Sequence, residues 1–173
     1  MKKEYLIYIT SQKEWSKIKS QGYITGKITP NPHNINLSSD ITSKFKSEYL
    51  VGIKGGTENS WKRSGAIYKM MINNRNPVIL KIPINQTFSE NILVREALFL
   101  SPKFLKYSYG KNFITNSKKP KEKLTKEEEE AMKFYIESTR TLQEYNTADF
   151  EAPEIWTTER RIPNWKIEKL DNI

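Results

Sequence analysis

Carboxylates, amines, guanidinium groups and phenols are the side chains with which this chain can do chemistry. The sequence has no cysteine and a single histidine, His33. The lack of cysteine excludes disulfides, thiolate metal sites and a cysteine nucleophile. His33 lies in a Pro-Asn loop, where a solvated side chain is the usual occupant, and one imidazole cannot form a histidine-rich metal site. We therefore expect no bound metal.

Three separated segments contain residues that suit one reaction centre. The first joins an N-terminal strand to a short helix, the second carries an arginine before a strongly apolar strand, and the third carries a glutamate in a late strand. The glycine motifs of P-loop and dinucleotide-binding proteins are absent. The segments are Tyr8-Ile9-Thr10-Ser11 with Gly22-Tyr23-Ile24, then Lys62-Arg63-Ser64-Gly65-Ala66-Ile67-Tyr68, and finally Phe150-Glu151-Ala152-Pro153-Glu154-Ile155-Trp156 with Ile162-Pro163.

In order and spacing, these segments resemble the ADP-ribosyltransferase superfamily, and most closely its DarT-type enzymes, which ADP-ribosylate DNA bases. The resemblance implies NAD as the co-substrate, Glu154 as the catalytic glutamate and Arg63 as the catalytic arginine beside NAD. Tyr8 stands where the family carries a histidine. The cofactor contacts that we expect are Tyr8, Thr10, Ser38 and Tyr49.

The chemistry of that reaction fits these residue types. Cleavage of the nicotinamide–ribose bond passes through an oxocarbenium-like species, which a carboxylate stabilises while it holds the ribose hydroxyls. Glu154 can do this and can also take a proton from the accepting atom as a general base. Arg63 would bind the NAD phosphates or orient Glu154 through a forked contact. Enzymes that modify protein arginine commonly carry Glu or Gln at the position of Ala152, so the target is not expected to be arginine.

The charge of the chain favours a polyanionic partner. Lys and Arg outnumber Asp and Glu by 29 to 20, which gives a net charge of +9, and phosphates release counterions on binding such a surface. A lysine-rich proteome from an AT-rich genome is the alternative explanation. Residues 101–150 form a basic, aromatic insertion in which we expect contacts to single-stranded DNA or RNA. The residues assigned to these contacts are Lys103, Lys106, Tyr107, Tyr109 and Lys111.

Hydrophobic periodicity and capping signals predict the elements that would position these groups. The expected strands are residues 5–10, 35–37, 77–84 and 154–158, and residues 93–100 form a core element that is either helix or strand. The first helix begins at the N-cap Ser11, with Glu14 closing a capping box, and ends at Gly22. Further helices are expected from Ser39 or Asp40 through residues 45–49, over 61–72 and over 125–145.

Together these features predict one α+β domain over residues 1–173, with a split β core of two small, mostly antiparallel sheets around an NAD cleft and helices outside. No apolar run is long enough to span a membrane, and we expect cytoplasmic residence. The expected function is transfer of ADP-ribose to a base of DNA or RNA, as a toxin, a phage-defence protein or a phage-encoded effector, with an antitoxin or inhibitor protein as a further partner. Two alternatives stay open: an RNA 2′-phosphotransferase relative, and a catalytically silent module that binds nucleic acid or protein.

Overall fold

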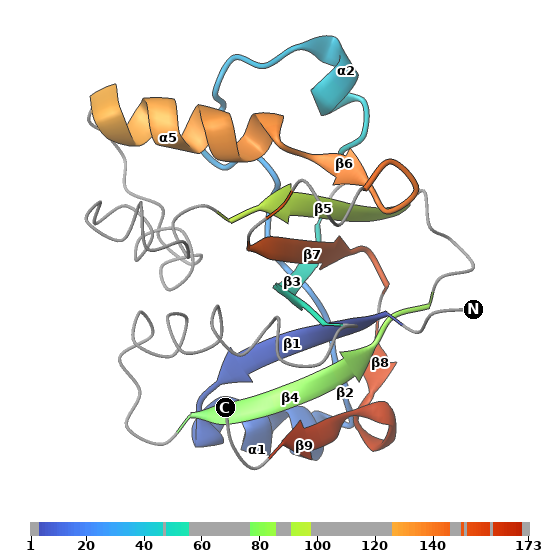
Figure 1. Ribbon diagram of the computed structural model, residues 1–173. Coiled ribbons are helices and arrows are strands. Elements are labelled where there is room, and N and C mark those ends of the chain that lie inside the picture. Colours follow the sequence, from blue (N-terminus) through green and yellow to red (C-terminus); the bar gives the residue numbers. More distant parts are fainter. Residues whose placement is uncertain are drawn as a thin grey trace.

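The computed structural model describes residues 4–46, 48–55, 77–85, 91–97, 126–145, 150, 152–159 and 161–170. These residues form a mixed α+β structure built on a seven-stranded antiparallel sheet of order β6-β5-β7-β3-β1-β4-β9 (Figure 1). A second sheet pairs β2 with β8. The strands are β1 Tyr5–Thr10, β2 Tyr23–Ile24, β3 Leu50–Lys54, β4 Val78–Pro83, β5 Ile92–Glu96, β6 Arg140–Thr141, β7 Pro153–Thr157, β8 Ile162–Pro163 and β9 Glu168–Leu170.

Few helices accompany the sheet in the described parts of the chain, and none of them is long and apolar enough to cross a membrane. The first begins as predicted, because the Ser11 side chain caps it by accepting from the backbone N–H of Glu14 at 3.1 Å. It ends at Gly22, whose φ of 90° is left-handed. The helices are α1 Gln12–Gln21, α2 Ser39–Thr42, α5 Lys126–Glu137 and the 3-10 turn η3 Asn164–Lys166.

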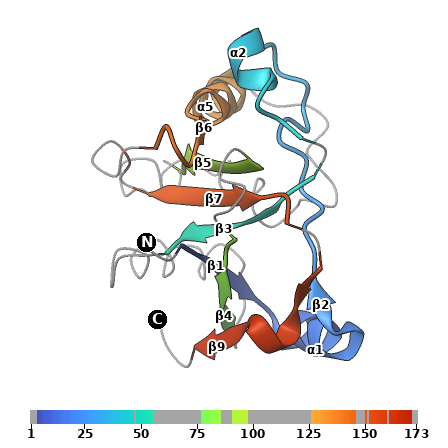
Figure 2. The same cartoon turned by 90° about the vertical axis from the view of Figure 1, so that its right-hand side faces the viewer.

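The two faces of the main sheet bury separate hydrophobic clusters, because side chains alternate along each strand. We call the side that packs against Met132, Tyr135 and Ile136 of α5 the α5 face. The opposite side packs against Trp15 and Ile18 of α1, and we call it the α1 face. Figure 2 shows the two helices at opposite ends of the twisted sheet. Each strand therefore sends one set of side chains to each cluster.

The sheet narrows where β1 meets β3. Only two residue pairs join these strands, whereas β1 and β4 pair over six residues and β5 and β7 over five. The strands β6, β5, β7 and β3 therefore form one group and β1, β4 and β9 another, connected through a short ladder. Figures 1 and 2 show the two groups turned strongly relative to each other.

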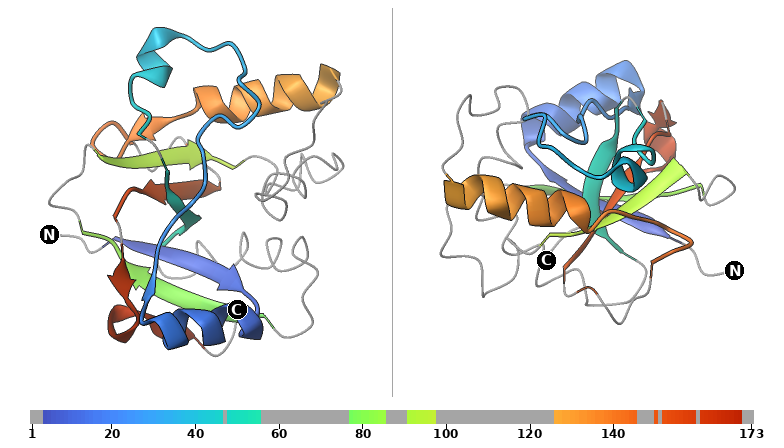
Figure 3. Two further views of the ribbon diagram at one scale, coloured as in Figure 1. Left: turned by 180° about the vertical axis from the view of Figure 1, so that it is seen from behind. Right: turned by 90° about the horizontal axis from the view of Figure 1, so that it is seen from above.

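A long irregular segment, residues 25–38, covers the α5 face and is called the strap. It runs from β2 at one end of the molecule to α2 at the other, and passes over β3 and β7 (Figure 3). Ile28 anchors it through two backbone hydrogen bonds with Tyr49, at 3.0 and 2.9 Å. The Asn31 side chain fixes the bend of the strap through hydrogen bonds to the backbone N–H and the carbonyl of Ile35. Pro30, in the same segment, is buried.

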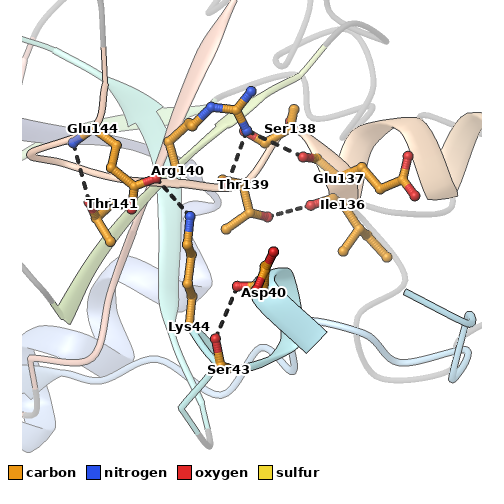
Figure 4. A network of polar contacts seen from close by, with 10 residues as sticks. All are labelled: Asp40, Ser43, Lys44, Ile136, Glu137, Ser138, Thr139, Arg140, Thr141 and Glu144. Carbon is orange, nitrogen blue, oxygen red and sulfur yellow. Dashed lines mark hydrogen bonds and ion pairs between the residues drawn. The ribbon is translucent and has the colours of Figure 1, made fainter. Parts of the chain in front are cut away.

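The segment that follows the strap and α2 is tied to the turn after the edge strand β6 (Figure 4). Lys44, just after α2, forms an ion pair of 2.7 Å with Glu144. Glu144 is held in turn by Thr141, whose hydroxyl donates to its carboxylate at 3.0 Å and accepts from its backbone N–H at 3.2 Å. This contact links the strap and α2 to the turn that follows α5 and β6.

Most predicted strands are confirmed, and residues 93–100 begin as strand β5, but three expectations were wrong. Residues 35–37 are irregular, because Ile35 and Leu37 pack onto the α5-face cluster as part of the strap. The second helix ends at Thr42, because Tyr49 pairs with Ile28 in an extended bridge. The helix predicted over 125–145 ends at Glu137, where the Ser138 and Thr139 hydroxyls bond to carbonyls of the last turn and β6 follows. The helix predicted over 61–72 lies outside the described residues.

The strap passes so close to β3 that its entry point requires glycine. A Cβ atom at Gly26 would lie 1.9 Å from the backbone nitrogen of Leu50 and 2.0 Å from the backbone carbon of Tyr49. We expect Gly26→Ala to lower the free energy of unfolding by about 1–3 kcal/mol, because backbone atoms cannot yield as a flexible side chain can. Urea denaturation measures this. Gly55→Ala is the matched control, since its nearest atom would be 3.1 Å away; an equal loss in both variants would contradict the close approach.

Candidate functional site

Glu154 is a carboxylate buried inside the molecule, with 2% of its surface exposed. As the second residue of β7 it pairs with Ile53 on β3 and with Arg95 on β5. It shares the α5 face with Trp156, which lies two residues further along the same strand. The strand register therefore places a carboxylate and a guanidinium side by side beneath α5 and the strap.

Two donors fix the orientation of the Glu154 carboxylate. The Tyr135 hydroxyl from α5 and the Trp156 indole N–H both donate to Oε1, the latter at 2.7 Å. No hydrogen bond from the described residues reaches Oε2. Burial raises the pKa of Glu154, and the two hydrogen bonds and the charge of Arg95 oppose that increase. The result is a carboxylate with one oxygen held and one available.

Arg95 is the charged partner of this carboxylate and is 1% exposed. Its Nε donates to the Thr139 hydroxyl at 2.8 Å. That hydroxyl donates its own proton to the Ile136 carbonyl at 2.5 Å, a contact that Figure 4 shows. Thr139 therefore acts on Arg95 as an acceptor only, which fixes the guanidinium. Burial lowers the pKa of Arg95, but arginine stays protonated in proteins.

Aromatic rings enclose the Arg95 guanidinium. Its carbon lies 4.2 Å from the ring centre of Trp156 and 5.2 Å from those of Tyr135 and Phe45. Such contacts compensate part of the hydration that a buried cation loses. Even so, Nη2 has no hydrogen-bond partner, and no ion pair joins Arg95 to Glu154 within the described part of the chain.

A small cavity of about 50 Å³ lies between these groups and the strap. It has room for a few water molecules, whereas ligand pockets are commonly ~300–1,000 Å³. The strap forms one wall of the cavity. The cavity is lined by Ile28, Thr29, Pro30, Pro32, Val51, Arg95, Met132, Tyr135, Glu154 and Trp156.

Of the expected cofactor contacts, Tyr49 lies beside the site. Its ring packs edge-on against Trp156 with ring centres 5.6 Å apart. Its hydroxyl accepts from the backbone N–H of Lys46 at 2.8 Å, and burial raises its pKa. Ser38 is exposed at the end of the strap, where its carbonyl accepts from the backbone N–H of Thr42 at 3.1 Å.

The structure does not bring Tyr8 and Thr10 to this cavity. Tyr8 packs against the α1-face cluster, and Thr10 follows two residues later on the same side of β1. Glu154 points to the α5 face, so the expected shared cleft of Tyr8 and Glu154 is not formed. The reason is the alternation of side chains along β1, which sends Ile7 and Ile9 to the α5 face instead. Burial raises the pKa of Tyr8 to about 12, so its phenol stays neutral.

The remaining predicted residues lie outside the described part of the chain. This applies to Arg63 and to the whole set of expected nucleic-acid contacts, namely Lys103, Lys106, Tyr107, Tyr109 and Lys111. Within the described ranges, no group of three or more His, Cys, Asp or Glu side chains is placed to hold a metal ion.

Sequence reasoning missed Arg95, Tyr135 and Trp156 as partners of Glu154. The sequence did contain a signal for Arg95. It directly follows the apolar run Ile92-Leu93-Val94, and a short continuous apolar run is typical of a strand that is buried on both faces. A charged residue inside such a run is almost never buried without a partner. Tyr135 gave no comparable signal, since an aromatic residue at helical spacing is most simply a core residue.

A second, more polar hollow of about 220 Å³ opens near the start of the strap, next to the β2-β8 sheet. Arg161 on its rim has a φ of 54° and lies 5.4 Å from the ring centre of Tyr23. None of the residues predicted for the site lines this hollow.

Comparison with protein-family models, with curated proteins and with solved structures finds no significant match to this chain. Arguments about function therefore depend on the residues and their geometry.

The burial of Glu154 makes stability depend on pH. Because its folded-state pKa lies above the ordinary 4.5, its stabilising contribution is complete below pH 4.5 and is lost as the pH rises through the folded-state pKa. We expect wild type to lose free energy of unfolding relative to Glu154→Gln as the pH rises above 4.5, in urea denaturation at a series of pH values.

Glu144→Gln is the control for that measurement. The hydrogen bond from Lys44 lowers the pKa of Glu144, so wild type should lose stability relative to this variant as the pH falls below 4.5. A difference between wild type and Glu154→Gln that does not change with pH would contradict the burial of an ionisable Glu154.

Proposed function

We propose that this chain is an NAD-dependent ADP-ribosyltransferase in which Glu154 is the catalytic carboxylate. One observation carries the proposal: a fully buried glutamate, held at one oxygen by Tyr135 and Trp156, stands beside a guanidinium at the β7 position that the sequence resemblance assigns to catalysis. Buried carboxylates with directed donors are typical of reaction centres, because a structural role does not require the energetic cost of burial.

The architecture gives separate support. The main sheet divides at the two-pair ladder between β1 and β3. Such a division is compatible with the split β core of two small sheets expected from the resemblance, although both groups of strands belong to one continuous antiparallel sheet. The described residues are mixed α+β, and the identification of the split core stays part of the proposal.

The proposed reaction breaks the bond between the anomeric carbon of ribose and the nicotinamide nitrogen, and nicotinamide leaves with the bonding electrons. A nitrogen or oxygen of the acceptor forms the new bond to that carbon and loses its proton. Oε2 of Glu154 holds a ribose hydroxyl and stabilises the developing positive charge. The charge of Arg95 favours the ionised form of Glu154 that this role requires. Arg63 keeps its predicted role, which is to bind the NAD phosphates or to orient Glu154.

Admission of NAD requires the strap to move. A cavity of about 50 Å³ does not hold a dinucleotide. Pro30 and its neighbours form one wall of the cavity. The strap is anchored by Ile28 near its start, and helix α2, which follows the strap, is anchored through Lys44. Exposed ion pairs such as the one between Lys44 and Glu144 contribute little, so that end can release at low cost.

The proposed acceptor is a base of single-stranded DNA or RNA. The net charge of +9 supports a polyanionic acceptor, and the basic, aromatic composition of residues 101–150 supports a single-stranded one.

Incubation of the full chain with labelled NAD and single-stranded DNA or RNA tests the proposal. We expect label to appear on one of the two nucleic acids with release of nicotinamide. Glu154→Gln should lower the rate by at least about 100-fold, because the variant loses the charge that stabilises the reacting ribose. Glu168→Gln, on the exposed strand β9, is the control and should react like wild type. The absence of label with wild type, on both nucleic acids, would defeat the proposal.

The small volume of the cavity favours a second candidate, a catalytically silent module that binds nucleic acid or protein. In that case the strap is a permanent cover, and the polar groups beneath it serve the fold. Calorimetry with NAD and, separately, with single-stranded DNA and RNA distinguishes the two candidates. An enzyme should show heat with NAD, whereas a silent module should show only salt-sensitive heat with nucleic acid.

A further inference from the structure

Arg95 and Glu154 both line the cavity beneath the strap, and each has one polar atom that makes no hydrogen bond with the described residues. Nη2 of Arg95 is buried without a hydrogen-bond partner, and Oε2 of Glu154 receives no hydrogen bond from the described residues. The two residues are direct cross-strand partners, yet no ion pair joins them. An unpartnered buried polar group is costly and rare in folded proteins, so it calls for a ligand or an ordered water.

The charges limit what such a ligand can be. An anion at Arg95 would be repelled by Glu154, and a cation at Glu154 would be repelled by Arg95, so a neutral polar group fits best. It must accept from Nη2 and donate to Oε2. Cross-strand partners have Cβ atoms only about 5 Å apart, and a hydroxyl can perform both roles through a single oxygen atom. The small cavity favours this compact group over a planar amide.

We propose that Arg95 is a ligand-binding residue, which donates from Nη2 to the same sugar hydroxyl that donates to Oε2 of Glu154. The identity of the sugar as a ribose of NAD rests on the function proposed above. The hydroxyl site itself depends only on the geometry of Arg95 and Glu154.

A purely structural role explains Arg95 less well. Its Nε already secures it to Thr139, and three aromatic rings enclose its guanidinium. A buried cation can often be replaced by an apolar side chain without loss of stability, so stability alone does not require an arginine here. A buried Nη2 without a partner, on a residue that lines a cavity together with Glu154, is what a binding role requires.

The Nε–H resonance of Arg95 in a nitrogen-edited NMR spectrum reports on this site directly, because that proton is buried and hydrogen-bonded. The probes are ribose, inorganic phosphate and nicotinamide, each added separately to the wild-type chain. We expect ribose to shift the Arg95 signal and the other two probes to leave it unchanged. A shift with phosphate would indicate an anion site, and a shift with nicotinamide would indicate an amide site. The absence of a shift with ribose would show that the hydroxyl site does not exist. Each of these results overturns the proposal.

Affinity for NAD provides the second measurement. Arg95→Met should weaken NAD binding about 10- to 100-fold, the value of one hydrogen bond from a charged donor, and Arg95→Lys should restore part of the loss. Arg140→Met is the matched control, because Arg140 on β6 is exposed and its side chain donates only to carbonyls of its own turn. The affinity of this variant for NAD should equal that of wild type. Equal affinity of Arg95→Met and wild type would overturn the role of Arg95.

The two proposals fail in different ways. If wild type binds no NAD and labels no nucleic acid, the proposed enzymatic function is wrong. The ribose-dependent shift of the Arg95 signal still tests whether the hydroxyl site exists. Conversely, labelling by wild type with full activity in Arg95→Met leaves the enzyme intact and removes Arg95 from ligand binding. Thermal unfolding of each variant identifies any loss of affinity that arises from unfolding.

Discussion

Two buried ionisable side chains on neighbouring strands impose the main constraint on this structure. Glu154 and Arg95 are each withdrawn from water, and neither neutralises the other through a direct ion pair. Their burial is tolerated because other groups replace part of the lost hydration: Tyr135 and Trp156 donate to the carboxylate, and Thr139 and the aromatic rings contact the guanidinium. Strand β5, strand β7 and helix α5 must keep their relative positions for these contacts to exist. The contacts that hold the polar site are therefore also contacts that pack the α5 face.

The strap is the second element that depends on this pair. It forms one wall of the cavity beside the two side chains and keeps water from that side, which strengthens the electrostatic interactions there. Its attachment is uneven, with close backbone packing at Gly26 and backbone pairing at Ile28, but an exposed ion pair at Lys44. An enzyme of the proposed type would use this difference, since the Lys44 end can release while the Ile28 end stays in place. The small cavity beneath the strap is also the observation that favours a silent binding module as the alternative.

The position of Tyr8 shows how strand geometry limits inference from motifs. The strands that carry Tyr8 and Glu154 lie in the same main sheet. The order of the motifs along the chain gave no indication of which face each residue occupies. Tyr8 and Glu154 face opposite sides, because the register of β1, β3 and β7 assigns them to different faces. A shift of one residue in either strand would have reversed the result. Any role for Tyr8 in binding NAD must therefore be exerted from the other side of the sheet.

Local sequence determined much of this protein by itself. The Ser11 cap and Gly22 fixed the first helix, the apolar run after Pro77 predicted β4, and the strand around Glu154 was identified from its pattern and resemblance. These features depend on residues close in the chain. Tertiary structure alone decided the end of the long helix at Glu137, the covering strap in place of a strand at 35–37, and the pairing of Arg95 with Glu154. Each of these depends on strand register and on contacts between distant segments, and the free energy of such contacts cannot be calculated from local pattern.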